Sequence, residues 1–357
     1  SPDPEDTLQA SQFLAAFDAA LEELPPHLRD VCRLHYRRGL SVPEAAQACS
    51  LPEGTVKKRL FTARSLLQAR LAHFRGEGLF RVGYMPVSDH LLAMCADHQG
   101  RGRNLPLHSR RYLSWASLAG DLERGRLDAA FIMAPLALAL HQSGTKLLYV
   151  MDGHHDGSSL AVSRHAERTR RMGLPGERST HRVLLSRLGH QQPTEYGDLP
   201  TLVVNPSSAI SSMRQNAIGS FFCAEPWSAK CVREGVGDTA IRSHDILPGH
   251  LCCILAVRED FARRQDTVVT DYVHAIFTAR DKVSRDPAHG ARVQAACTGI
   301  EEGVARGVLE QGGISFDDLE PDAGRINDFA HMAVEAGVLQ GPLDLTGFVC
   351  GDFCAHA

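Results

Sequence analysis

The sequence lacks any apolar run long enough to cross a membrane. Its apolar run at residues 136–140 is far shorter than the roughly 20 residues that a membrane helix needs. The first residues also lack the apolar segment of a secretory signal peptide. We therefore expect no membrane partner and a cytoplasmic location, where the ten cysteines would be thiols or metal ligands rather than disulfides.

Common enzymatic signatures are missing as well. The chain has no P-loop, no G-x-S-x-G, no H-E-x-x-H and no dinucleotide fingerprint, so we expect a protein that is not an enzyme. A net charge of −4 argues against a polyelectrolyte partner for the chain as a whole. With 357 residues, the chain is long enough for two or three domains.

The N-terminal part predicts a helix-turn-helix. Ser41 and Glu44 have the spacing of a capping box in front of a short helix at residues 42–48. A tight turn at residues 50–54 leads into a longer helix whose inward stripe starts at Val56. Two such helices joined by a tight turn can place the second one in the major groove of DNA.

Local charge favours DNA binding by this part. Residues 28–75 contain ten Lys and Arg but only three Asp and Glu, and basic groups gain affinity for DNA by releasing its counterions. An alternative is that these charges are ordinary solvated positions of a helical bundle. The predicted DNA-binding residues are Ser41, Thr55, Lys57, Lys58, Arg59 and Arg64.

The same segment resembles a known family. The elements S-x-x-E-A-A and G-T-V-K-x-R-L, within LPPHLRDVCRLHYRRGLSVPEAAQACSLPEGTVKKRLFTARSLLQARL, resemble region four of extracytoplasmic-function sigma factors. That resemblance implies promoter DNA and RNA polymerase as partners. A sigma factor also needs a preceding promoter-melting region, so either that region was removed before Ser1 or this domain works as a plain helix-turn-helix.

From residue 80 onward, apolar strands alternate with helices. The segment at residues 201–260 reads as strand, helix, strand, helix, strand, which is typical of a parallel sheet. Ligands of such sheets bind at the carboxyl ends of the strands. Glu225, Trp227, His250 and the adjacent pair Cys252 and Cys253 fall near such ends.

This region resembles the nitrate-type solute-binding proteins. The resemblance rests on AEPW at residues 224–227 and on RVGYMPVSDH, LSWASLAGDLERGRLDAAFIMAPLALAL and DGSSLAVS upstream. That family includes nitrate and bicarbonate receptors and a cytoplasmic nitrate/nitrite sensor. It implies ligand-binding roles for Trp115, His155, Ser158, His181, Glu225, Trp227, His250 and Cys253. The alternatives are a packed core indole for Trp115 and a helix-cap histidine for His181.

The predicted fold class is therefore an all-α helix-turn-helix domain followed by an α/β two-lobed domain of the type II periplasmic-binding-protein kind. We expect the first domain at residues 1–75, a linker at 76–79 and a sensor domain at 80–340, whose second lobe covers about 165–250. Residues 341–357 would form a cysteine-containing tail.

One departure from the family leaves the ligand open. Cys253 stands where the nitrate and bicarbonate receptors have a lysine that meets the anion, so the site loses a cation. One possibility is that another cation, such as Arg214 or a histidine, supplies the lost positive charge. A second is that the ligand is neutral or larger. The third possibility is a soft metal such as Cu or Zn, or oxidant sensing, at His250, Cys252, Cys253, Cys350 and Cys354.

These observations predict a cytoplasmic one-component transcription regulator. Its helix-turn-helix would bind promoter DNA, and its interlobe cleft would hold a small ligand, for which a nitrate-like or nitrite-like anion is the candidate. The alternative function is a soft-metal or thiol-based sensor, or a metal-dependent enzyme related to the thiamin pyrimidine synthases.

Overall fold

The structure is a computed structural model that describes residues 17–70, 79–100, 107–165, 169–196 and 198–355. The chain divides into two compact units, Ser1–Leu79 and Phe80–Ala357. Within the described residues, every helix is too short or too polar to span a bilayer.

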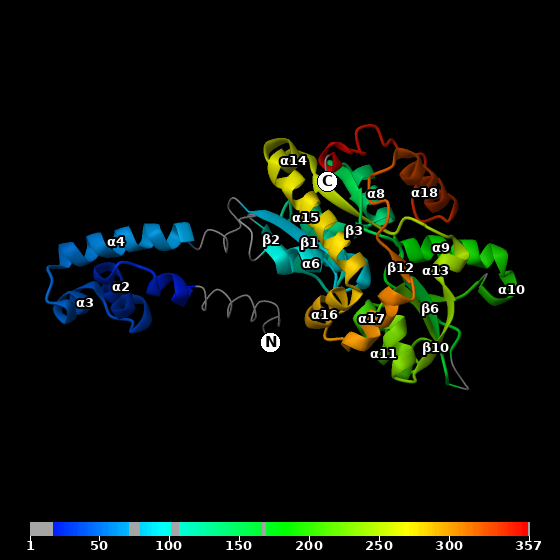
Figure 1. The fold of residues 1–357 in the computed structure, drawn as a ribbon, viewed down its shortest axis with the longest axis horizontal. Helices are drawn as coiled ribbons and strands as arrows, with labels where there is room; N and C mark the ends of the chain where they lie inside the picture. The colour runs from blue at the N-terminus through cyan, green and yellow to red at the C-terminus, as the bar shows by residue number, and fades with distance from the viewer. Residues whose placement is uncertain (1–16, 71–78, 101–106, 166–168, 197, 356–357) are drawn as a thin grey trace. The chain divides into compact units, whose positions relative to one another are not determined.

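The N-terminal unit is helical. Residues 17–22 form a helical segment, and α2 (Pro26–Cys32) continues into the π-helical turn η1 (Arg33–Arg37) (Figure 1). The helix-turn-helix consists of α3 (Val42–Cys49) and α4 (Glu53–Arg70).

Local sequence signals account for the start and the end of α3. Ser41 and Glu44 form the predicted capping box, in which the Ser41 backbone N–H donates to the Glu44 carboxylate at 2.8 Å. Ser50 ends the helix in the left-handed conformation with φ of 53°. The inward stripe of α4 is also as predicted, because Val56, Leu60, Ala63 and Leu67 are buried; residue 71 lies outside the described residues.

The larger unit contains two five-stranded sheets. The first has the order β2-β1-β3-β11-β4, made of β1 (Phe80–Tyr84), β2 (Leu107–Arg111), β3 (Ala129–Met133), β4 (Leu147–Asp152) and β11 (Cys253–Arg258). Strands β2, β1 and β3 run parallel, whereas β11 is antiparallel to both of its neighbours. The carboxyl ends of β1, β3 and β4 therefore share one edge with the beginning of β11.

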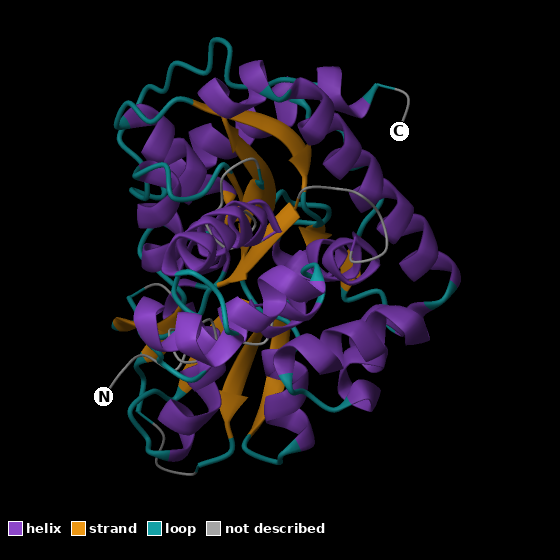
Figure 2. Ribbon diagram, turned by 90° about the vertical axis from the view of Figure 1, so that its left-hand side faces the viewer, coloured by secondary structure: helices purple, strands orange, loops and turns teal. Residues whose placement is uncertain are grey.

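Helices pack on both faces of this sheet. Figure 2 shows strands in orange among helices in purple. Alternate residues of β3 point to opposite faces. Phe131 packs in the cluster that contains α6 (Leu91–Gly100) and α15 (Asp266–Arg285). Ile132 packs in the other cluster, which contains α7 (Trp115–Glu123) and α8 (Ala134–Gln142).

The second sheet belongs to the second lobe. Its order is β10-β6-β9-β7-β8, made of β6 (Ser158–Ser163), β7 (Met172–Leu174), β8 (Thr201–Val203), β9 (Ser220–Ala224) and β10 (Gly237–Arg242). The chain enters this lobe after β4, through β5 (His155–Asp156), and leaves it before β11. The helices of this part are α9 (Thr180–Gln191), α10 (Pro193–Tyr196), α11 (Pro206–Arg214), α12 (Trp227–Arg233) and α13 (Ser243–Ile246).

The chain then returns to the first lobe. The remaining elements are η2 (Ser88–His90), α14 (Glu259–Arg264), α16 (Pro287–Thr298), α17 (Glu302–Glu310), β12 (Ile314–Ser315), α18 (Ala323–Glu335) and η3 (Asp352–Cys354). Strand β12 pairs with β5 at the crossover.

The fold class is the predicted one, but the segment at residues 201–260 does not form one parallel sheet. Strands β8 and β9 both run parallel to β7 in the second sheet, as expected. The last strand of the segment, β11, lies instead in the first sheet and runs antiparallel there. The five predicted elements are present, but β10 and α13 were not predicted, and helical and strand patterns carry no information on which sheet a strand joins.

Candidate functional site

The shared edge of the first sheet gathers chemically active side chains. Asp89 lies in η2, which follows β1, while His154 follows β4 and Cys253 begins β11. Cys253 is paired in register with Met133 at the end of β3. The antiparallel direction of β11 therefore brings the start of this strand to the edge where Asp89 and His154 lie.

Four buried side chains converge at this edge: Asp89, His154, Cys252 and Cys253. One nitrogen, one carboxylate oxygen and the two sulfurs all lie within 4.8 Å of one another. The His154 Nε2 atom is 3.4 Å from Asp89 Oδ2. The sulfurs of Cys252 and Cys253 are 3.8 and 3.9 Å from that same oxygen.

Both cysteines can face Asp89 because the backbone is irregular before β11. Leu251 forms an isolated bridge with His155, and regular pairing of β11 starts only at Cys253. Adjacent residues on a regular strand would point to opposite faces. The break at Cys252 removes that constraint.

The ionisation of this group is strongly perturbed. Burial raises the pKa of the Asp89 carboxyl well above its ordinary value, with the nearby Cys252 adding to the effect. A hydrogen bond from Cys253, helped by His154, holds the pKa of the Cys252 thiol well below its usual range. Burial raises the pKa of the Cys253 thiol. Cys252 is thus the thiol that ionises first.

The second lobe adds polar groups to the same place. Ser158 Oγ lies 2.9 Å from His181 Nε2, and the Thr180 hydroxyl donates to the Cys252 carbonyl at 3.2 Å. Burial lowers the pKa of His181 to about 4, so this imidazole is neutral at neutral pH. Ser158 and His181, both predicted ligand residues, therefore lie side by side, and the residue that caps α9 is Ser179 rather than His181.

Trp115 reaches the site from the first lobe. The indole packs edge-on against His90, with ring centroids 5.5 Å apart. Its Nε1 atom is buried without a hydrogen-bond partner among the described residues. Burial, and then the neighbouring His154, lower the pKa of His90 to about 3, so this second imidazole is also neutral at neutral pH.

Three residues that were predicted to bind ligand or metal serve other partners. His155 Nε2 lies 2.9 Å from Asp152 Oδ2, in the network that holds α18 on β4. His250 Nδ1 lies 3.1 Å from Asp156 Oδ1. The guanidinium of Arg214, the suggested compensating cation, pairs with Glu234 on an exposed surface.

The predicted five-residue metal set needs correction. Only Cys252 and Cys253 belong to the buried group. The Cys354 thiol donates to the Val150 carbonyl at 3.2 Å, and Cys350 lies beside Asp352. The tail packs against β4 rather than entering the site, so Cys350 and Cys354 are not co-ligands of Cys252. His250 is absent from the buried group as well, and its Nδ1 atom faces Asp156.

Sequence reasoning missed Asp89 and His154. Asp89 carried a weak signal, since it follows the carboxyl end of the first strand of this unit. His154 is the neighbour of His155, and adjacent residues on an extended chain point apart. His155 was taken as the site residue, whereas His154 is the one that points to the cysteines.

An open cavity of about 570 Å³ lies between the lobes, lined by α12, β10 and α17. Helix α17 packs on α16, which packs on α6 of the first lobe. Glu225, Arg233 and Arg242 line this cavity. Burial raises the pKa of Glu225, whose carboxylate accepts from the Ala229 N–H at 3.0 Å. Trp227 is also buried, and the Lys230 ammonium lies over the indole ring of Trp227.

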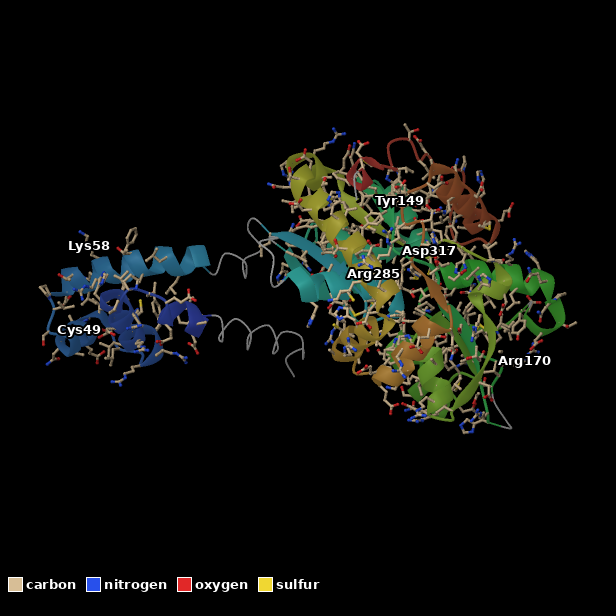
Figure 3. All side chains as sticks on the ribbon, in the orientation of Figure 1. Cys49, Lys58, Tyr149, Arg170, Arg285 and Asp317 are labelled. Carbon is tan, nitrogen blue, oxygen red and sulfur yellow. The ribbon has the colours of Figure 1, made fainter. Side chains whose placement is uncertain are left out.

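In the N-terminal unit, α4 presents basic groups to solvent. Lys58 projects from α4 away from α2 and α3 (Figure 3). The Lys57 side chain is 66% exposed and lies 3.8 Å from Glu53. Arg59 is tied back to the His27 carbonyl at 3.4 Å, and Thr55 is partly buried. The side chain of Arg64 lies outside the described part of the chain.

Two family profiles match this chain. The NMT1-like family matches residues 79–298, and sigma-70 region 4 matches residues 14–67. The bicarbonate transport ATP-binding protein CmpC of Synechococcus elongatus is 24% identical over 204 residues, covering 50% of this chain and 31% of that protein. The nitrate import ATP-binding protein NrtC of Synechocystis is 22% identical over 238 residues, covering 57% and 35%. The chain thus spans about a third of these relatives.

Solved structures show the same fold for the larger unit. A zinc-bound ligand-binding component of an ABC-type import system from Staphylococcus aureus has a TM-score of 0.71 at 21% identity, covering 78% of this chain and 98% of that one. The periplasmic nitrate-binding protein NrtA from Synechocystis has a TM-score of 0.69 at 15% identity, covering 78% and 88%.

Proposed function

Because this chain belongs to the NMT1-like family and also matches sigma-70 region 4, we propose that it is a ligand-responsive transcription regulator. The N-terminal unit would bind promoter DNA, and the larger unit would hold a small ligand between its lobes. The observation that carries this proposal is that one chain combines a unit similar to sigma-70 region 4, with exposed lysines on α4, and a two-lobed solute-binding fold.

The proposed DNA surface is the outer face of α4. Lys57 and Lys58 point into solvent, where ammonium groups can meet phosphates. Arg59 would contribute less, since its guanidinium already bonds to a backbone carbonyl. Ser41 caps α3 with its hydroxyl, so we expect it to position that helix rather than to contact DNA.

The similarity to sigma-70 region 4 supports promoter DNA and RNA polymerase as partners, and hence a cytoplasmic location. The similar proteins are ligand-binding or transport components, which points away from enzymatic activity. A ligand can shift DNA binding only by as much as it prefers one state of the protein over the other. Regulation would thus require that DNA-bound and free forms differ in ligand affinity.

A small anion is the proposed ligand of the open interlobe cavity. Arg242 lines it together with the hydroxyls of Ser159 and Thr239, and guanidinium groups bind planar anions well. Arg233 lines it too, but its guanidinium already pairs with Glu301 at 3.3 Å. The buried cysteine site is a poorer place for an anion, because its neighbouring imidazoles His90 and His181 are neutral at neutral pH.

DNA binding is tested by the double variant Lys57→Ala/Lys58→Ala. We expect weaker binding to a fluorescent duplex in anisotropy titrations. The slope of log K against log salt should become less negative by about 0.9 for each phosphate contact that is lost, or roughly 2 in total. Arg285→Ala, an 80% exposed arginine of the larger unit, is the control. An unchanged affinity and slope in the double variant would remove α4 from the DNA surface.

The anion proposal is tested by calorimetric titration with nitrate, nitrite and bicarbonate. Binding of one of them should be lost in Arg242→Ala and kept in Arg214→Ala, whose guanidinium is paired with Glu234 outside the cavity. If all three anions fail to bind the unaltered protein, the small-anion proposal is wrong, although the DNA-binding proposal is untouched.

A further inference from the structure

We infer that Asp89, His154, Cys252 and Cys253 form a binding site for one thiophilic metal ion of the Zn²⁺ class. Two thiolates, one imidazole and one carboxylate are ligands that Zn²⁺ accepts, and four is its preferred coordination number. The carboxylate favours Zn²⁺ over Cu⁺, which prefers sulfur ligands. This site is distinct from the open cavity around Arg242.

Three of the six distances between the ligand atoms are close to those of a tetrahedron. Zinc binds sulfur at about 2.3 Å and nitrogen or oxygen at about 2.0–2.2 Å, so the ligand atoms of a tetrahedral site are roughly 3.3–3.8 Å apart. Here the nitrogen of His154 is 3.4 Å from Asp89 Oδ2. The sulfurs of Cys252 and Cys253 are 3.8 and 3.9 Å from that oxygen. These three pairs are within a few tenths of an ångström of the tetrahedral values, and the other three pairs lie within 4.8 Å.

The same side chains have buried polar atoms without hydrogen-bond partners in the described part of the chain. Asp89 Oδ1 and both ring nitrogens of His154 are buried without hydrogen-bond partners among the described residues. Burying such groups without compensation is costly, and most buried polar atoms in proteins are paired. A cation bound by His154 Nε2, the carboxylate and the thiols would compensate this nitrogen and the carboxylate charge, while His154 Nδ1 would stay unpaired.

The backbone around these ligands is held in place. The Cys252 carbonyl accepts from the Ala134 N–H, and the Cys253 carbonyl accepts from the Gly153 N–H, both at 2.8 Å. A Cβ on Gly153 would lie only 3.0 Å from the Cys253 carbonyl oxygen. Glycine thus allows the close approach that sets His154 beside the two cysteines.

Asp89 is fixed through its neighbour Ser88. The Ser88 N–H donates to the Glu225 carbonyl at 2.7 Å, and the Ser88 hydroxyl accepts from Gln294 at 2.7 Å. Neither bond uses the Asp89 carboxylate, which is left directed at the thiols. The ligands are therefore held by packing and hydrogen bonds that do not involve the ion.

The site touches both lobes. Asp89 and Cys253 belong to the first lobe, and the Thr180 hydroxyl of the second lobe donates to the Cys252 carbonyl. All four ligands lie on the first lobe or at the crossover, so an ion would act on lobe closure through the hydrogen bond between Thr180 and the Cys252 carbonyl. Its action as a controlling ligand rests on the proposed function, whereas its binding does not.

Metal uptake by the full chain tests the inference. Purified protein is stripped with a chelator, incubated with Zn²⁺ and analysed for bound metal. We expect one tightly held equivalent, with Co²⁺ giving the visible absorption of a tetrahedral thiolate site. That equivalent should be lost in Cys252→Ser and Cys253→Ser, and reduced in affinity at least tenfold in Asp89→Asn.

Matched controls separate the site from the other thiols. Cys350→Ser and Cys354→Ser alter cysteines that we place outside the site, and both variants should keep the equivalent. Circular dichroism of each variant checks folding, and Asp89→Asn keeps the shape of the side chain. Loss of the equivalent in the control variants, or its retention in Cys252→Ser and Cys253→Ser, would overturn the site. The site would also be overturned if the protein bound Cu⁺ equally well with and without Asp89→Asn and did not bind Zn²⁺.

The regulatory step is read separately by DNA anisotropy with and without Zn²⁺. A change in DNA affinity that Cys253→Ser abolishes supports the ion as the controlling ligand. Zinc binding with no change in DNA affinity leaves the metal site standing and refutes the ion as the controlling ligand. Failure of the unaltered protein to bind DNA in either condition refutes the regulator function alone, since metal uptake is measured without DNA.

Discussion

Replacing Arg325 with alanine removes the charge partner of a fully buried carboxylate. Asp152, at the end of β4, is 0% exposed. Its carboxylate accepts from the Arg325 guanidinium of α18 and from the Tyr149 hydroxyl, and His155 Nε2 lies 2.9 Å away. This network, rather than a ligand, accounts for the position of His155.

The expected cost follows from burial. Removing one partner of a buried ion pair typically destabilises a protein by about 3–5 kcal/mol, because the remaining charge stays buried and unpaired. The Arg325 side chain is 24% exposed, so water can reach part of the space that the removed side chain leaves. The lower end of that energy range therefore applies. We expect the free energy of unfolding to fall by about 3 kcal/mol, with a Tm lower by roughly 6–12 °C.

Tryptophan fluorescence during urea unfolding measures this loss. The chain has two tryptophans, Trp115 and Trp227, and both lie in the larger unit, so the signal reports that unit alone. Asp152→Asn removes the charge while keeping the shape. In that background, Arg325→Ala should cost less than about 1 kcal/mol. An equal loss in both backgrounds, or a loss below about 1 kcal/mol in the unaltered protein, would refute the charge argument.

Three further predictions follow from local contacts. Burial raises the pKa of Asp121, but three arginines and a tyrosine hydroxyl outweigh it, so the pKa is lowered on folding. The carboxylate therefore stabilises the fold fully above about pH 4, and this stabilisation is lost as the pH falls below that value. Asp121→Asn should lower the Tm at pH 7 and make the Tm less dependent on pH in acid. Ser41→Ala should cost about 1 kcal/mol and speed amide exchange in the first turn of α3, whereas Ser41→Thr should not. Gly153→Ala should destabilise the larger unit by roughly 1–3 kcal/mol in urea, because the new methyl meets the Cys253 carbonyl; a neutral effect would contradict that close approach.

Several features were predictable because their signals are local. The capping box of Ser41 and Glu44 needs only four consecutive residues, and the buried stripe of α4 needs only helical spacing. The helix α8 was missed, since the apolar segment after β3 was read only as a run too short for a membrane.

The sequence by itself thus determined a helix-turn-helix followed by a two-lobed α/β unit, and it singled out Cys252 and Cys253 as unusual. Only the tertiary structure decided which residues join them. Asp89 is 163 residues from Cys252 along the chain. The path of the chain after β4 points His154, rather than His155, toward the cysteines. Periodicity tells which face of an element is buried, but the direction of β11 decides which distant side chains meet at its end.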